Sequence, residues 1–239
     1  GIISPWNYPL SIPFGEIVMA LMAGNGVMLK VAAATPAVGR AIEQIVAAGE
    51  LPEGLFHHIV GSGSKVATGF FDNGLDRLFF TGSVPAGKTL MAQAAQTLTP
   101  VSLELGGNDP MLVLEDADLE RATNGAAWGG YQNAGQSCGG VERVYVVDAV
   151  YDQFVDLLAK KTRQLRHGIG CSGFDVDIGS LTTAGQLRTV QQHVEDALAK
   201  GARIEAQSRP VGNVENGFFF PATLLTQVTD DMLTMCDAT

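Results

Sequence analysis

The chain has 239 residues, of which 15 are lysine or arginine and 25 are aspartate or glutamate, so its net charge is −10 at pH 7. This acidic balance repels phosphates and anionic headgroups and argues against nucleic acid and membrane surfaces as partners, while a hydrophobic share of 46% provides a packed core and excludes disorder. Three cysteines are too few for a disulfide framework, and no apolar run approaches the ~20 residues of a membrane span, so we predict a cytoplasmic protein.

Short apolar runs alternate with helical patterns through the first half of the chain. Strands are predicted at 27–30, 55–60, 77–80 and 101–105. Thr35 and Pro36 open a helix that ends near Gly49, a short helix covers 65–71, and another follows Ser83. The apolar face of this last helix comprises Leu90, Met91, Ala94, Ala95 and Leu98. The alternation predicts an α/β domain whose parallel sheet is covered on both faces.

A second α/β series begins after the predicted boundary at Gly106-Gly107, so we expect one domain over 1–106 and another over 107–239. Strands are predicted at 111–114 and 141–147, with helices near 117–131, 149–166 and 184–200. Thr183 is the expected N-cap of the last helix and Gly201 its C-terminal stop. Its apolar stripe comprises Leu187, Val190, Val194, Ala197 and Leu198.

Only 17% of the residues are charged, below the ~25% of an average soluble domain. Either the chain is merely rich in alanine and glycine, or it is a piece of a larger protein whose other parts cover its apolar faces. The chain opens on a strand-like segment without an initiating methionine and stops at Thr239 without a closing element, which favours the second interpretation.

Cys138 lies among small residues in the segment Asn133-Ala134-Gly135-Gln136-Ser137-Cys138-Gly139-Gly140. Backbone N–H groups that approach closely there can lower the pKa of the thiol and hold an oxyanion, as a nucleophile requires. The alternative is a buried structural cysteine, which is also what we expect of Cys171 and Cys236. The three cysteine positions fit no zinc pattern, and we predict no metal site.

Glu104 and Asn7 are the other candidate catalytic residues. Glu104 ends an apolar strand, where partial desolvation raises the pKa of a carboxylate towards that of a useful base; the alternative is an edge strand with Glu104 pointing to water. The amide of Asn7, between Trp6 and Tyr8, can donate to an oxyanion; the alternative is a turn-forming asparagine.

A strand followed by a glycine-containing turn and a helix, Phe80-Thr81-Gly82-Ser83 with Gly87, can present helix N–H groups to an anion. Taken alone it is also consistent with an ordinary turn. Lys30 ends a strand and can reach a ribose hydroxyl or a phosphate, or else it is solvated. The spacing GxGxxG is absent, because Val66 stands where the third glycine after Gly61 and Gly63 would fall.

Together and in this order, the segments resemble the NAD(P)-dependent aldehyde dehydrogenase family. The matching segments are 5–7 (PWN), 27–30 (VMLK), 80–83 (FTGS) with Gly87, 104–107 (ELGG), 133–138 (NAGQSC) and 217–223 (GFFFPAT). The resemblance implies a Rossmann-type parallel-sheet cofactor domain followed by a second α/β catalytic domain, both incomplete because this chain corresponds to the central part of a family protein. It also implies a homo-oligomer when the protein is full-length.

The resemblance further implies that a small-molecule aldehyde is oxidised to a carboxylic acid with NAD or NADP. Cys138 attacks the carbonyl, Asn7 and the Cys138 N–H stabilise the oxyanion, and Glu104 activates the water that hydrolyses the thioester. The implied cofactor-binding residues are Ile3, Ser4, Pro5, Trp6, Lys30, Gly63, Phe80, Thr81, Gly82, Ser83, Gly87, Glu104, Leu105, Gly106 and Cys138.

The chain departs from the family pattern at two places. Val31 and Ala33 replace the proline and the acidic residue that often follow the strand-end lysine. The choice between NAD and NADP as cofactor is therefore open. Ala238 stands where the family has a nicotinamide-ribose glutamate. These departures keep open a catalytically inactive dinucleotide-binding fragment or scaffold. A third alternative, a cysteine hydrolase with a histidine base, is weak because all four histidines lie in strand or helix patterns.

Overall fold

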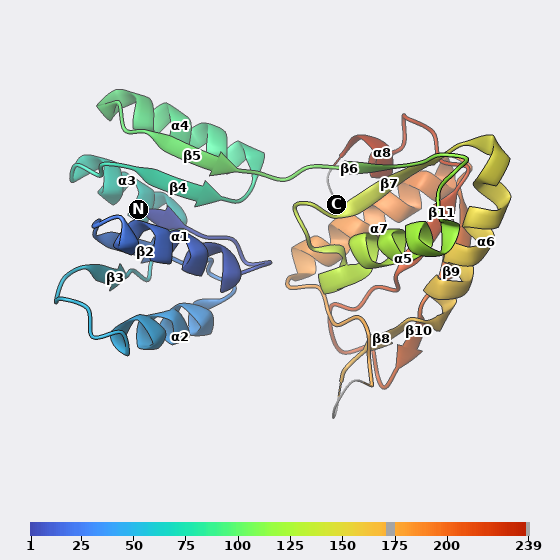
Figure 1. Cartoon of the computed structure of the whole chain (residues 1–239), viewed down its shortest axis with the longest axis horizontal. Coiled ribbons are helices and arrows are strands. Elements are labelled where there is room, and N and C mark those ends of the chain that lie inside the picture. Colours follow the sequence, from blue (N-terminus) through green and yellow to red (C-terminus); the bar gives the residue numbers. More distant parts are fainter. Residues whose placement is uncertain (171–174, 238–239) are drawn as a thin grey trace. The chain divides into compact units, whose positions relative to one another are not determined.

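A computed structural model describes residues 1–170 and 175–237 and divides the chain into two compact units, residues 1–106 and 107–239 (Figure 1). Cys171 and Ala238 lie outside the described residues. Each unit is an α/β structure. None of the helices formed by the described residues is long and apolar enough to cross a membrane.

The first unit contains a five-stranded, entirely parallel sheet in the order β3-β2-β1-β4-β5 (Figure 1). The strands are β1 (Ile2–Ile3), β2 (Val27–Lys30), β3 (Phe56–His58), β4 (Leu78–Thr81) and β5 (Val101–Glu104). The helices are α1 (Ser11–Met22), α2 (Pro36–Ala47), α3 (Gly63–Asp72) and α4 (Val84–Thr97). This is the parallel sheet with intervening helices that the alternation of patterns predicts.

Both faces of this sheet are covered, because consecutive side chains of a strand point to opposite sides. Ile2 packs with Ile17 of α1 and Ile42 of α2 in one apolar cluster. Its neighbour Ile3 packs with Phe70 of α3, Leu90 of α4 and other residues in a second cluster. The central strand β1 is therefore buried on both sides, as a parallel sheet requires.

The sequence predicted individual helices, their caps and their ends less well than it predicted the alternation of strands and helices. Helix α1 was not predicted, because apolar Val18 and Met19 face outward alongside buried Ile17 and erase a one-sided pattern. Thr35 precedes α2 but does not cap it; its hydroxyl donates to Ala32 O (3.4 Å). Of the apolar face predicted for α4, Leu90 and Ala94 are buried, but Met91 and Ala95 are exposed. Leu98 lies beyond the end of the helix, where it adopts a left-handed φ of 54° and is 88% exposed.

The second unit begins with β6 (Asp109–Val113), which pairs in parallel with β7 (Val141–Val146). Helices α5 (Leu119–Tyr131) and α6 (Asp148–Gln164) bury Ala126, Phe154 and Leu158 against Val113 of this pair. The short helix η1 (Gln132–Gly135) links α5 to the loop that carries Cys138.

The rest of the second unit is built from short strands that the sequence did not reveal. Strand β8 (Arg166–Gly168) pairs in parallel with β10 (Arg209–Val211), and β9 (Arg203–Gln207) pairs antiparallel with β11 (Thr223–Thr226). The remaining helices are α7 (Ala184–Ala199) and α8 (Leu233–Cys236). Thr183 caps α7 by accepting from Gln186 N (3.1 Å), and Gly201 follows with φ 102°. On α7 the buried positions are His193 and Ala197, whereas Leu198 is 41% exposed.

Candidate active site

Cys138 stands at the tip of a tight turn in the second unit. Gly140 N donates to Ser137 O (3.2 Å) and closes the turn just before β7 begins. Cys138 is exposed, and its thiol makes no hydrogen bond with a described residue. The alternative of a buried structural cysteine is therefore wrong for Cys138. It is also wrong for Cys236, which is exposed and donates to Met232 O (3.0 Å) and Asp230 O (3.3 Å).

The segment before this turn has an uncommon backbone. Asn133, Ala134 and Gly135 are successive left-handed residues, with φ of 51°, 58° and 76°. Asparagine and glycine tolerate this region, but alanine pays about 1–2 kcal/mol in it. Sequence reasoning included this segment as part of a motif but did not predict its conformation.

Buried Gln136 links the left-handed segment to another part of the second unit. Its Nε2 donates to Asn133 O (3.0 Å), and its Oε1 accepts from Thr182 N (2.8 Å). The bond is reciprocated, because the side chain of Asn133 donates from Nδ2 to Gln136 O (3.2 Å). The amide of Gln136 is thus a bridge between the loop and the residue that precedes the N-cap of α7.

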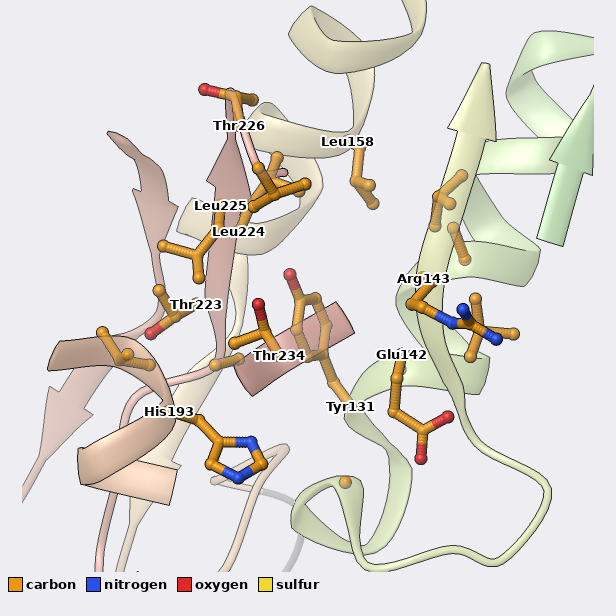
Figure 2. Close-up of a pocket in the computed structure, with 18 of the residues that line it drawn as sticks. Tyr131, Glu142, Arg143, Leu158, His193, Thr223, Leu224, Leu225, Thr226 and Thr234 are labelled. Carbon is orange, nitrogen blue, oxygen red and sulfur yellow. The ribbon is translucent and has the colours of Figure 1, made fainter. Parts of the chain in front are cut away.

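A cavity of about 520 Å³ lies inside the second unit (Figure 2). Strands β7 and β11 and helices α6 and α7 contribute to its walls, and the polar side chains shown there include Glu142, Arg143 and His193. Ala134, Gly135 and Gln136 line it, but Cys138 does not. The cavity is therefore adjacent to the cysteine loop without containing the thiol.

The charged groups of this cavity already serve the fold. Arg143 donates to Asn108 O (2.6 Å from Nη2) and to Met235 O (3.4 Å from Nη1), which ties β7 to the chain ahead of β6 and to α8. Glu142 accepts from Asp109 N (2.6 Å), although burial raises the pKa of its carboxyl. Burial lowers the pKa of His193, because it disfavours the charged imidazolium. These contacts describe a structural junction rather than a set of converging catalytic groups.

In the first unit, the carboxyl ends of the parallel strands gather several predicted cofactor residues. Ser4 N donates to Lys30 O (3.0 Å) and Gly82 N donates to Glu104 O (3.0 Å), so the ends of β1 and β2, and of β4 and β5, are held in register. Ser4 and Thr81 are buried, and their hydroxyl oxygens have no hydrogen-bond partner among the described residues.

Lys30 is the unusual group at this edge. It is only 7% exposed, burial lowers its pKa, and its ammonium makes no hydrogen bond or ion pair with a described residue. The alternative of a solvated strand-end lysine is therefore wrong. A Cβ on Gly63, the first residue of α3, would lie 3.9 Å from Lys30 Nζ, so this ammonium points to the N-terminus of that helix.

Two helices begin beside these strand ends. Ser62 caps α3 by accepting from Lys65 N (3.4 Å), and Ser83 caps α4 by accepting from Ala86 N (3.4 Å). Gly87, within α4, has a packing role, because a Cβ there would approach Leu105 Cδ2 to 2.9 Å.

The two remaining catalytic candidates belong to the first unit. Asn7 Oδ1 accepts from Tyr8 N (3.1 Å), a contact between neighbouring residues. Glu104 is exposed at the end of edge strand β5, so the expected desolvation of its carboxylate is wrong in this chain and the water-facing alternative describes it.

Sequence reasoning also missed Glu16 on α1. Its Oε2 is buried without a hydrogen-bond partner among the described residues. Burial, and then the charge of Glu104, raise its pKa to about 7. The only available signal was a lone carboxylate in an apolar segment, Ile12-Pro13-Phe14-Gly15-Glu16-Ile17-Val18, and that segment was not recognised as a helix.

Comparison with known proteins decides the family. The model of the aldehyde dehydrogenase family matches residues 1–239. The chain belongs to this family. The aldehyde-dehydrogenase-like fold expected from the motifs is confirmed, since solved structures of this kind superimpose on 98% of the chain with TM-scores near 0.9.

Several curated proteins and solved structures are similar over most of this chain. A 4,4'-diapolycopene aldehyde oxidase of Methylomonas sp. is 42% identical over 89% of this chain, and a putative succinate-semialdehyde dehydrogenase [NADP(+)] of Mycolicibacterium smegmatis is 40% identical over 97%. Among solved structures, an E. coli NADP-dependent enzyme has a TM-score of 0.92 at 37% identity. A 3,6-anhydro-L-galactose dehydrogenase in complex with NAP has 0.91 at 32%.

The chain spans less than half the length of these two curated relatives, 39% and 44% respectively. It spans 48% and 50% of the two solved chains.

Proposed function

We propose that the polypeptide containing this chain oxidises an aldehyde to a carboxylic acid with NAD or NADP, and that Cys138 is its nucleophile. The observation that carries the proposal is the exposed thiol at the tip of the 137–140 turn, within the segment that matches the family motif. A catalytic thiol must be reachable by the substrate, which a buried structural cysteine is not.

In the proposed reaction the Cys138 thiolate adds to the carbonyl carbon and gives a thiohemiacetal. The backbone N–H of Cys138 and the amide Nδ2 of Asn7 donate to the developing oxyanion. When bound, NAD(P) would supply a hydride acceptor for the carbon attached to Cys138, which leaves a thioester on this residue. Glu104 then takes a proton from water, whose oxygen attacks the resulting thioester, and the acid departs as Cys138 regains its thiol form. The roles of Asn7 and Glu104 rest on the order of motifs in the sequence.

The first unit offers groups that suit a dinucleotide. Ser4 and Thr81 present buried hydroxyls without partners among the described residues, and Lys30 presents an ammonium that is likewise unpaired. All three lie at the carboxyl ends of parallel strands, where doubly wound sheets bind nucleotides. We propose that Lys30 holds the adenosine ribose and that the N-terminus of α4, with Ser83, holds the pyrophosphate.

The cofactor choice between NAD and NADP follows from the segment after Lys30. Ala33 is exposed there and carries no carboxylate that would repel a 2′-phosphate. The relative from M. smegmatis is named for NADP(+), and the 3,6-anhydro-L-galactose dehydrogenase was solved with NAP. We propose that NADP is accepted, alongside or in place of NAD.

The test is nicotinamide reduction by the complete polypeptide with succinate semialdehyde or a short aliphatic aldehyde and either cofactor. Cys138→Ala should abolish turnover, and Cys236→Ala, which removes the second exposed thiol among the described residues, should leave it unchanged. If Cys138→Ala retains the full rate, the proposal is wrong.

A second candidate is a dinucleotide-binding scaffold without catalysis. It is favoured by one observation: the buried hydroxyls and Lys30 all lie within residues 1–106, whereas the thiol lies in the other unit. Binding of NADP to this chain, together with no turnover by the complete polypeptide on any aldehyde, would favour the scaffold. The cytoplasmic location and the homo-oligomer stay predictions.

A further inference from the structure

We infer that Gln136 is a positioning residue that sets the orientation of Cys138 by holding the left-handed segment before it. The inference rests on the proposed function, because it gives Gln136 a task only if Cys138 is the nucleophile. Its basis is the arrangement of hydrogen bonds around a buried amide that lies two residues before the thiol.

The segment that Gln136 holds is unfavourable on its own. Asn133 and Ala134 have φ of 51° and 58°, and Gly135 follows at 76°. Non-glycine residues stay in this region only when their surroundings fix them, and such residues cluster at active sites. Ala134 has no side-chain group with which to fix itself, so the restraint comes from its neighbours.

Gln136 supplies that restraint from both ends of its amide. Asn133 O accepts from Gln136 N (3.2 Å) and from Gln136 Nε2 (3.0 Å), so the backbone and the side chain of one residue hold the same carbonyl. The opposite atom of the amide, Oε1, accepts from Thr182 N (2.8 Å). Gln136 itself is only 7% exposed, so these contacts lie away from water and an unpaired atom there would be costly.

The connection reaches Cys138 through the backbone. Ser137 N donates to Gly135 O (2.9 Å), and Gly140 N donates to Ser137 O (3.2 Å), so the left-handed segment runs directly into the turn that bears the thiol. If Asn133 and Ala134 relaxed to right-handed values, the turn and the Cys138 N–H would be redirected. A donor aimed at a developing oxyanion works only when its direction is fixed in advance.

The sharpest test is Gln136→Glu, which changes one end of the amide. The remaining carboxylate oxygen can still accept from Thr182 N, but the other oxygen now faces Asn133 O and repels it. Protonation of the new carboxyl restores a donor towards Asn133 O, so the defect should reverse as the pH falls towards the ordinary glutamate pKa of about 4.3. Gln192→Glu, at an exposed position on α7, is the matched control.

Two readouts are needed. In the complete polypeptide, kcat of Gln136→Glu at neutral pH should fall about tenfold with little change in KM, the effect of one lost hydrogen bond and the unpaired acceptor left behind. In this chain, the reaction rates of Cys138 and Cys236 with 4,4′-dithiodipyridine are compared by peptide mass spectrometry. The Cys138-to-Cys236 ratio should fall at pH 8 and return to the wild-type ratio at acid pH, while Gln192→Glu keeps the wild-type ratio throughout.

Each result decides the question. A wild-type kcat and a wild-type reactivity ratio for Gln136→Glu would overturn the inference while the proposed function stands. Full activity of Cys138→Ala would overturn the proposed function, whatever Gln136→Glu does. If Gln136→Glu fails to fold, the neutral Gln136→Met variant is measured; should it also fail to fold, Gln136 is a requirement for folding and the positioning role is wrong.

Discussion

Replacing Lys30 by methionine separates the stability of the first unit from its proposed ligand binding. Methionine keeps the unbranched apolar stem and removes the ammonium. Lys30 is 7% exposed, and its charge has no hydrogen bond or ion pair among the described residues. Burial disfavours the charged form of Lys30, although its Nζ is not among the fully buried side-chain atoms, so Lys30→Met should raise the free energy of unfolding of the first unit by about 1 kcal/mol, the lower end of the cost of an unpaired polar group.

The same change should weaken cofactor binding. A charge-assisted hydrogen bond contributes about 1.5–3 kcal/mol, so loss of the ammonium should raise the Kd for NADP roughly 10- to 100-fold. Lys30→Met should therefore increase the stability of the first unit and decrease its affinity for the cofactor. Both effects have one cause, because the ammonium is unpaired in the free protein and becomes paired when the ligand binds.

The pH dependence gives a second check. Burial lowers the folded-state pKa of Lys30, so the folded state disfavours the protonated form. The penalty is complete below the folded-state pKa and vanishes as the pH rises to the unfolded value of about 10.4. The stability advantage of Lys30→Met should therefore be largest below the folded-state pKa and shrink as the pH rises towards the unfolded value.

The assay uses the two tryptophans, Trp6 in the first unit and Trp128 in the second. In a Trp128→Phe background, Trp6 fluorescence reports denaturant unfolding of the first unit alone, and calorimetric titration gives the Kd for NADP. Lys160→Met, at an exposed position of α6, is the control and should change neither quantity. A less stable Lys30→Met variant, or one with an unchanged Kd, would refute the reasoning.

Three further predictions concern other sites. Gly168→Ala should cost about 1–3 kcal/mol in thermal unfolding, because φ is 152° and a Cβ would overlap Val211 O, whereas Gly179→Ala, with open space, should be near neutral; equal effects would contradict this. Ala134→Gly should stabilise the second unit by about 1 kcal/mol and Ala134→Val should destabilise it, since φ is 58°; denaturant unfolding followed by Trp128 measures both, and a stabilising valine would contradict it. Glu16→Gln should stabilise the first unit at pH 8 but not at pH 4. The pKa of Glu16 is raised from 4.5 to about 7, so the stability of the wild-type unit falls as the pH rises between these two values, and a pH-independent difference between the two proteins would contradict this.

The sequence by itself determined the order of elements in the first unit, apart from helix α1. Strands such as Val27–Lys30 and Leu78–Thr81 are mostly apolar along their length, because the sheet is buried on both faces. This pattern can be recognised within a few consecutive residues. The motif order also identified the family, and the small neighbours of Cys138 singled it out as a candidate nucleophile, although its exposure was not predicted. All of these features depend on residues that are close together in the sequence.

Tertiary structure alone decided the environment of each side chain. Lys30 and Glu104 both end strands, yet Lys30 is buried beside α3 and Glu104 is exposed on an edge strand, because strand order is set by crossovers and not by local sequence. The left-handed run 133–135 depends on Gln136 and on Thr182, which lies 46 residues beyond Gln136, a contact that no local pattern encodes. The short strands β8 to β11 were likewise invisible, since three to five residues carry too little periodicity and are stabilised by partners distant in the chain.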